Sequence, residues 1–318
     1  MVIAMLTPIT NSGINFEIDT ENPEAALALM EMCKRLLNFV CTFKRINIPD
    51  EDDISNRTCH RILISLNYAI EDIKTTKNRD YLKEIRQLSR KESQFQYLFD
   101  VLATAKTLAI PDIGVLRGTS TGSCVYGEVS SHQMRSFVRE LRIGAGDIFM
   151  DLGSGYGQLC CLVSAYAGVK KSIGIEILKN LHDAGVKHKN EFERLMKYFG
   201  KEHKEIELIH GDMTDFEDKI KTEPTVIFVN NYKFDPMLTH KLKKIFMGCE
   251  DGTRIISPIP LVTADEYSKF HHWKAESLVP MTYSRRLKIV PENVSWCHNK
   301  PCEFTLTTIN RNRAPFSR

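Results

Sequence analysis

The sequence predicts an α/β fold in its second part, preceded by an α-helical N-terminal part, and two patterns support this. Beyond about residue 147, short apolar runs alternate with stretches that carry apolar residues at helical spacing, which gives the order strand, helix, strand. This order is typical of a mostly parallel sheet packed between helices. Before residue 110, apolar residues recur at helical spacing with charged residues between them, so this part is predicted to be helical.

Three helical segments are predicted in the N-terminal part, at residues 21–43, 59–73 and 93–106. The following stretch is rich in Gly, Ser and Thr and has no sustained period. Connections of this length are usually functional or disordered. We therefore expect a helical domain over residues 1–110, a loop over 111–131 that contacts the ligand or substrate, and an α/β domain over 132–318.

Five short apolar runs are predicted to be the strands of the sheet. They cover residues 147–152, 171–176, 206–210, 225–230 and 253–257. Helical patterns separate them at residues 158–168, 181–200 and 236–248. Because ligands of such sheets bind at the carboxyl ends of the strands, the site is expected in the loops that follow these runs.

Composition restricts the class of protein. The chain has 318 residues, of which 42% are hydrophobic and 26% charged, so it can bury a sizeable core. No apolar run reaches the length that spans a membrane. The nine cysteines are mostly scattered and no secretory signal precedes them, which favours a reduced intracellular compartment. Cys297, His298 and Cys302 lack a second cysteine pair at zinc spacing, so no metal is expected.

The turn after the first predicted strand is unusually rich in glycine. The stretch "DLGSGYGQ" places Gly153, Gly155 and Gly157 at alternate positions. Glycine destabilises regular elements, so this spacing predicts a backbone that bends sharply or approaches a ligand closely. The helix predicted from Gln158 directs its amino-terminal N–H groups toward that ligand. Glu176 ends the next strand, where a carboxylate usually binds a ribose diol, so the predicted ligand is a nucleoside.

Spacing and charge favour S-adenosylmethionine over a dinucleotide. The dinucleotide fingerprint G-x-G-x-x-G requires a glycine where this chain has Gln158. Asp151 precedes the glycines, where a carboxylate repels a pyrophosphate but attracts the ammonium group of an amino acid. Asp212 follows the third strand and is positioned to accept a hydrogen bond from the adenine amine. Taken singly, Glu176 and Asp212 would more often be helix caps or solvated loop residues.

Seven motifs in one order resemble the non-SET histone lysine methyltransferases named for disruption of telomeric silencing. They are "VYGE" (125–128), "DLGSGYGQ" (151–158), "MKYFGKEH" (196–203), "GDM" (211–213), "VIFVNNYKF" (226–234), "GTRIIS" (252–257) and "NVSW" (293–296). Weaker similarity around "NYAIEDI" extends the resemblance into the helical part. The resemblance implies a seven-stranded class I methyltransferase sheet with an N-terminal α-helical domain, and S-adenosyl-L-methionine as the cofactor.

The resemblance also implies the residues of the site. The cofactor-binding residues would be Tyr126, Phe149, Met150, Asp151, Leu152, Gly153, Ser154, Gly155, Tyr156, Gly157, Gln158, Glu176, Asp212 and Met213. Asn230 would lie beside the reacting centre, and Trp296 and Phe304 would line a narrow channel for the substrate lysine. The alternatives are that Asn230 caps a strand end and that Trp296 packs in the core.

The expected chemistry depends on desolvation of the substrate lysine. A lysine amine has a pKa of about 10.4, so freeing its lone pair at neutral pH costs about 4–5 kcal/mol. Burial in an apolar channel lowers the pKa of an ammonium group and reduces this cost. A catalytic base is therefore not required.

The channel departs from the family pattern, which leaves three functions open. The family usually has an aromatic residue before "VYGE", a Thr after it and a Tyr after "VSW", whereas this chain has "TGSC", Val129 and Phe304. The first function is methylation of a lysine on the globular core of nucleosomal histone H3. The second is cofactor or chromatin binding without turnover, and the third is methylation of another substrate.

The resemblance implies that the protein acts on the nucleosome in the nucleus. No membrane is expected among its partners. The net charge of +3 is too small to indicate a nucleic-acid binder by itself. Local basic clusters could contact nucleosomal DNA or an acidic protein surface, although such clusters are usually solvated. They contain Lys241, Lys243, Lys244, Arg285, Arg286, Arg311 and Arg313.

Overall fold

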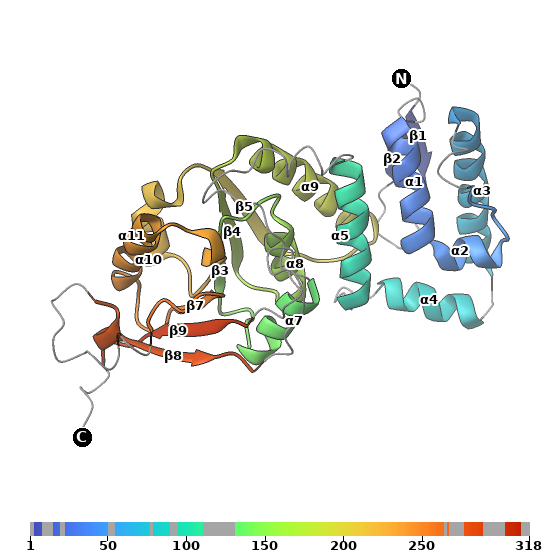
Figure 1. Cartoon of the computed structure of the whole chain (residues 1–318). Helices are drawn as coiled ribbons and strands as arrows, with labels where there is room; N and C mark the ends of the chain where they lie inside the picture. Colours follow the sequence, from blue (N-terminus) through green and yellow to red (C-terminus); the bar gives the residue numbers. More distant parts are fainter. Residues whose placement is uncertain are drawn as a thin grey trace. The chain divides into compact units, whose positions relative to one another are not determined.

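The computed structural model describes residues 3–7, 15–19, 23–49, 55–76, 79–89, 95–110, 131–263, 266, 277–288 and 303–312. The chain divides into two compact units. The first comprises Met1–Ile113 and Val186–His203, and the second comprises Gly114–Gly185 and Lys204–Arg318. Figure 1 colours both units along the sequence.

The first unit is mainly helical. It contains α1 (Pro23–Arg35), α2 (Asn38–Phe43), α3 (Asn56–Thr75), α4 (Arg79–Ser89), α5 (Phe95–Ala109) and most of α9 (Lys179–Tyr198). In α3 the residues at helical spacing from Cys59 to Ile73 are buried, and the Ser55 hydroxyl caps the helix by accepting a hydrogen bond from Thr58 N. The three predicted helical segments are confirmed, the first of them as the two helices α1 and α2.

A short antiparallel strand pair also belongs to this unit, although only helices were predicted there. The pair consists of β1 (Ile3–Leu6) and β2 (Phe16–Asp19). Strands of four residues contain too few alternations to be predicted from periodicity. Helix α9 contacts the pair: Arg194 stacks on the Phe16 ring at 3.9 Å, and Tyr198 Oη donates a hydrogen bond of 2.7 Å to Thr7 O. These contacts join residues far apart in sequence, and no local pattern indicates them.

The second unit is built on a seven-stranded sheet. Its strands are β3 (Ile148–Leu152), β4 (Lys171–Glu176), β5 (Glu205–His210), β6 (Val226–Val229), β7 (Arg254–Ser257), β8 (Thr282–Arg286) and β9 (Thr305–Ile309). The order across the sheet is β5-β4-β3-β6-β7-β9-β8. The first five strands are parallel, and β9 is antiparallel to both β7 and β8. The predicted α/β fold with a mostly parallel sheet is therefore confirmed.

Helices cover both faces of this sheet (Figure 1). They are α7 (Ser131–Glu140), α8 (Gln158–Tyr166), α10 (Glu217–Thr222) and α11 (Pro236–Met247). On one face Met150 and Leu152 share a buried cluster with Ile245 and Phe246 of α11. Side chains alternate along a strand, so Asp151 points to the opposite face.

The order of the strands reverses at β3, because β3 pairs with β4 on one side and with β6 on the other. In open α/β sheets this reversal creates a crevice beyond the carboxyl ends of the strands, where ligands bind. Leu152 lies opposite Ile175 in β4 and opposite Val229 in β6. The residues that follow these three therefore emerge at one edge of the sheet. Among the helices that the structure describes, none is long and apolar enough to cross a membrane.

Candidate functional site

The turn between β3 and α8 has a backbone that requires glycine. Gly153, Gly155 and Gly157 have φ angles of 86°, 56° and 72°, all in the left-handed region. The N–H groups of Gly153 and Ser154 both donate to Ile175 O, at 2.9 and 3.0 Å. The turn is thus fixed to the end of β4, and Gly157 forms the N-cap of α8.

Glu176 fixes the same turn from the end of β4. Its Oε2 accepts a hydrogen bond of 2.8 Å from Gly155 N, and its Oε1 accepts one of 2.8 Å from Leu178 N. Burial raises the pKa of this carboxyl, although the two backbone hydrogen bonds act in the opposite direction. A carboxylate oxygen has two lone pairs, so each oxygen retains an acceptor site for a ligand hydroxyl.

Asp151 is a second buried carboxyl at this edge, with 4% of its surface exposed. Burial raises its pKa well above the usual value, and the charge of Glu176 raises it further. In the described ranges, the Asp151 carboxylate has no hydrogen bond or ion pair. Two neighbouring buried acids favour a cationic ligand. The ammonium and sulfonium groups of S-adenosylmethionine meet that requirement, so the residues present fit this cofactor.

Asp212 and Met213 follow β5. Asp212 Oδ1 accepts hydrogen bonds from Thr214 N and Thr214 Oγ1, at 2.8 and 2.9 Å, and caps the short 3-10 helix η2 (Met213–Phe216). Met213 is 8% exposed and belongs to the buried cluster of the sheet. Asp212 therefore has a capping role in the structure, and its contact with adenine remains a prediction.

The other residues predicted to bind the cofactor lie in β3 and in the turn. Phe149, Met150 and Leu152 are fully buried, and their contact with the cofactor remains a prediction. Tyr156 is 1% exposed and its hydroxyl donates a hydrogen bond of 2.6 Å to Gln158 Oε1. Tyr126 lies outside the described residues.

Two consecutive asparagines after β6 have different environments. Asn231 is held at both ends of its amide: Nδ2 donates to Ile259 O at 2.9 Å, and Oδ1 accepts from Ile259 N at 3.0 Å. Asn230 Oδ1 is buried and has no hydrogen-bond partner among the residues that the structure describes. An unsatisfied buried acceptor at the edge of a ligand crevice is a candidate functional group. The Asn231–Ile259 pairing could not be predicted from the sequence, because the partner atoms belong to the backbone of Ile259.

Phe304, predicted to line the lysine channel, lies directly before β9 with 1% of its surface exposed. Its ring packs edge-on against Phe137 at 4.8 Å and lies 6.1 Å from Phe228. Phe228 lies in β6, two residues before Asn230, so this aromatic cluster is close in sequence to the end of β6. Its contact with a substrate remains a prediction. Trp296 lies outside the described residues, as do the Cys297–Cys302 stretch and Val129.

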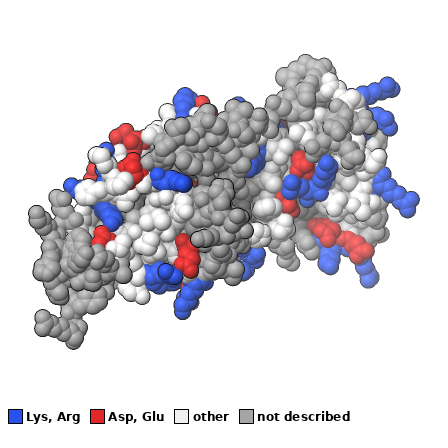
Figure 2. All heavy atoms as spheres, viewed as in Figure 1, with Lys and Arg blue, Asp and Glu red and all other residues white. Residues whose placement is uncertain are grey.

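Several basic residues that were predicted to meet the nucleosome form ion pairs within the chain. Lys243 pairs with Glu266, Arg285 with Glu140 and Arg286 with Glu303, at 3.1, 2.8 and 2.8 Å. Arg311 pairs with Asp251 at 3.0 Å and donates to Met247 O, which satisfies a carbonyl at the end of α11. Lys241 and Lys244 are exposed, and Arg313 lies outside the described residues. Figure 2 shows basic and acidic side chains interspersed on the face in view.

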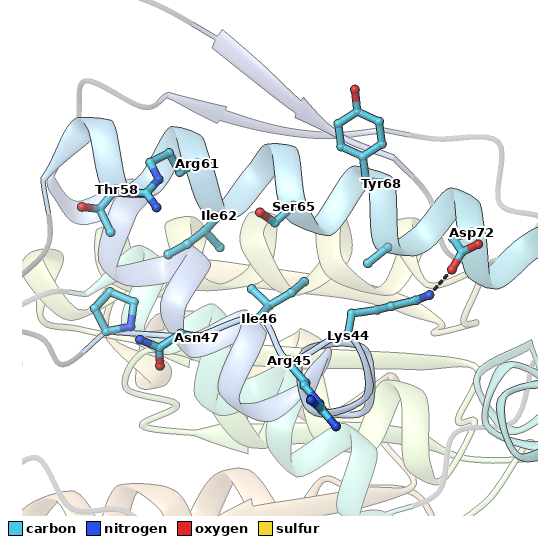
Figure 3. Close-up of a pocket in the computed structure, with 12 residues that line it drawn as sticks. Lys44, Arg45, Ile46, Asn47, Thr58, Arg61, Ile62, Ser65, Tyr68 and Asp72 are labelled. Carbon is cyan, nitrogen blue, oxygen red and sulfur yellow. Dashed lines mark hydrogen bonds and ion pairs between the residues drawn. The ribbon is translucent and has the colours of Figure 1, made fainter.

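A separate cavity of about 700 Å³ lies in the first unit. Lys44, Arg45, Ile46 and Asn47 border it on one side and α3 on the other, with Tyr68 at its rim (Figure 3). Lys44 forms an ion pair with Asp72 across it. In the part of the chain that the structure describes, there is no cluster of His, Cys, Asp and Glu that could hold a metal.

Comparison with known proteins identifies one family. The family model described as histone methylation protein DOT1 matches residues 108–309, more than half of the chain. A Caenorhabditis elegans protein is 36% identical over 191 residues, and a Drosophila melanogaster protein is 28% identical over 228 residues. Both are named histone-lysine N-methyltransferase, H3 lysine-79 specific.

The matches cover different shares of the two chains. The worm match spans 59% of this chain and 20% of its relative, and the fly match spans 71% and 12%. The chain therefore corresponds to a small part of the curated relatives it matches. Among solved structures, a SAM-dependent O-methyltransferase from Thermotoga maritima is 14% identical and has a TM-score of 0.41, covering 60% of this chain and 69% of its own.

Proposed function

The chain belongs to the DOT1 family of histone methylation proteins, and we propose that it transfers a methyl group from S-adenosylmethionine to a lysine on the core of nucleosomal histone H3. The names of its relatives point to lysine 79 of that histone. A histone substrate would place the protein on chromatin in the nucleus. The observation that carries the proposal is the pair of buried acids, Asp151 and Glu176, beside a turn of left-handed glycines.

Each part of the cofactor would have a partner at this edge. Asp151 would bind the ammonium group, and the free lone pairs of Glu176 would accept hydrogen bonds from the ribose hydroxyls. Asp212 would accept one from the adenine amine. When bound, S-adenosylmethionine supplies an electrophilic methyl group on a positively charged sulfur.

The remaining residues would orient and desolvate the substrate lysine. Asn230 Oδ1 would accept a hydrogen bond from the lysine amine and align its lone pair with the methyl carbon. Phe304, together with Trp296, would keep water from the amine and so lower its pKa. The proton lost by the amine would pass to solvent, so no residue needs to act as a base.

A second candidate function is cofactor or chromatin binding without turnover. Phe304 occupies the place where the family usually has a tyrosine, and its buried ring has no hydroxyl to offer a substrate. An inactive member of the family would retain Asp151, Glu176 and the glycine turn, but it would lack a functional channel for the substrate lysine.

Methyl transfer distinguishes the two functions. The full chain would be incubated with methyl-labelled cofactor and recombinant nucleosomes, and each histone would be analysed by mass spectrometry. Methylation of a lysine on the core of histone H3 is expected. Cofactor binding without label on any histone would favour the second function, and label elsewhere would identify another substrate.

A further inference from the structure

A cavity in the first unit contains two cysteines. It has a volume of about 440 Å³ and lies where α1 meets α2 and the segment after α2. It is lined by Cys33, Lys34, Asn38, Cys41, Thr42, Arg45, Ile46, Asn47 and Ile48. Lys34, Asn38, Thr42 and Arg45 are exposed, so solvent reaches the rim of the cavity.

Cys33 and Cys41 both line this cavity. Cys33 lies in α1 and is fully buried, whereas Cys41 lies in α2 and is 5% exposed. The interaction between the two side chains lowers the pKa of Cys41 and raises that of Cys33. Both are free thiols in this structure.

We propose that Cys33 and Cys41 form a peroxide-sensitive dithiol that closes to a disulfide. The Cys41 thiolate attacks hydrogen peroxide, which gives a sulfenic acid and hydroxide. The Cys33 thiolate then displaces hydroxide from the sulfenic sulfur, which gives the Cys33–Cys41 disulfide. The two sulfurs lose two electrons and two protons in total, and the peroxide is reduced to two waters. A thiol reductant reverses the step.

Cys59, Cys160 and Cys249 are less suited to react first. Cys59 neighbours Cys33 but is 1% exposed, and burial raises its pKa. Cys160 is fully buried in α8, and burial raises its pKa well above the usual value. Burial also raises the pKa of Cys249 to about 12. Because the thiolate is the nucleophile, these three should react slowly with peroxide.

The disulfide would join α1 to α2 and affect a second cavity. Arg45, Ile46 and Asn47 line both this cavity and the one drawn in Figure 3. A covalent link at Cys41 restrains α2, from which this segment continues. Oxidation should therefore reduce the motion of the segment that the two cavities share.

Peroxide treatment of the reduced full chain tests the proposal. After blocking the remaining thiols, mass spectrometry should find the Cys33–Cys41 peptide pair, and Cys41 should be consumed at least about tenfold faster than Cys249. In Cys33→Ser, Cys41 should accumulate as a sulfenic acid that a cyclic diketone traps. In Cys41→Ser, Cys33 should react no faster than Cys160.

Three results would overturn the proposal. The first is a Cys41 that reacts as slowly as Cys249. The second is a disulfide between Cys33 and Cys59 in place of Cys41. The third is unchanged formation of a Cys33 disulfide in Cys41→Ser. Circular dichroism of each variant would verify that the reactivity belongs to the folded protein.

Discussion

Glu176 and Gly155 are joined by a hydrogen bond of 2.8 Å, in which the Gly155 N–H donates to Glu176 Oε2. The carboxylate expected to bind a ribose therefore also fixes the glycine turn that would surround the cofactor. Binding and preorganisation depend on one side chain, so its substitution should affect both stability and affinity.

Substitution of Glu176 by Gln tests this double role. One carboxylate oxygen becomes an NH2 group, which cannot accept from either Gly155 N or Leu178 N. We expect a loss of about 1–3 kcal/mol in the free energy of unfolding, together with weaker cofactor binding. Asp212→Asn is the matched control, since its remaining oxygen can still accept from Thr214. Denaturant unfolding and calorimetry would measure both, and equal stability of the two variants would contradict the anchoring role.

Asp151 should make the free protein less stable as the pH rises. Its pKa is raised in the folded state by burial and by Glu176, so the folded state retains a proton that the unfolded chain has lost. Stability is therefore greatest below the usual carboxyl pKa of about 4 and falls as the pH rises toward the raised value. Asp151→Asn should remove this decline and raise the stability of the free protein at pH 7.

The same Asp151→Asn variant should bind S-adenosylmethionine more weakly, because it has no charge for the ammonium group. Unfolding curves at several pH values, with and without cofactor, measure both effects. A wild-type stability that rises over this pH range, with no gain in the variant, would contradict the assignment of a raised pKa to Asp151.

Asn230 and Asn231 provide a matched pair for the reacting centre. Asn230→Ala removes a buried oxygen that has no partner among the described residues, so the free energy of unfolding should stay the same or increase. Turnover should fall by about tenfold or more, which corresponds to about 1.4 kcal/mol. Asn231→Ala should instead lower stability by about 1–3 kcal/mol, because Ile259 N loses its acceptor and Ile259 O retains only the Ser257 hydroxyl. Turnover by Asn230→Ala equal to that of the wild type would remove Asn230 from the site.

Gly153 tests whether the turn depends on its left-handed backbone. A Cβ on Gly153 would have no atom within 4 Å, so Gly153→Ala adds backbone strain and no steric clash. We expect a loss of about 1–2 kcal/mol. Gly146 has equally open surroundings without a positive φ, so Gly146→Ala should change stability by less than about 0.5 kcal/mol. Thermal unfolding of both variants measures this difference. Equal melting temperatures of Gly153→Ala and Gly146→Ala would contradict backbone strain at position 153.

The sequence was sufficient to predict the five parallel strands of the sheet and the glycine turn that follows β3. The five apolar runs correspond to β3, β4, β5, β6 and β7, because parallel strands between helices have nearly continuous apolar character, although the edge strand β5 is only partly buried. Glycine spacing predicted the turn, since only glycine adopts three left-handed conformations within five residues at little cost. β8 and β9 were not among these runs, since β8 reads "TYSRR" and β9 contains three threonines.

Other features depend on contacts between distant residues or on backbone atoms. The role of Ile175 O, which accepts hydrogen bonds from Gly153 and Ser154, has no side-chain signature. The basic residues were predicted from local charge alone, so their pairing with Glu140, Asp251, Glu266 and Glu303 could not be predicted. The cap formed by Asp212 agrees with the alternative that the sequence left open for that residue.

The initial rate of methyl transfer to intact nucleosomes, compared with the rate on free histone H3 at equal concentration, tests the central claim most directly. The proposed target lies on a folded surface flanked by DNA, so transfer should be faster on nucleosomes. Because several basic side chains are already paired within the chain, added salt should slow transfer only weakly, with a slope of about 0.9 per phosphate contact. Faster transfer to nucleosomes, lost in Asn230→Ala, is the predicted result. A folded, cofactor-bound protein that methylates neither substrate would contradict the account.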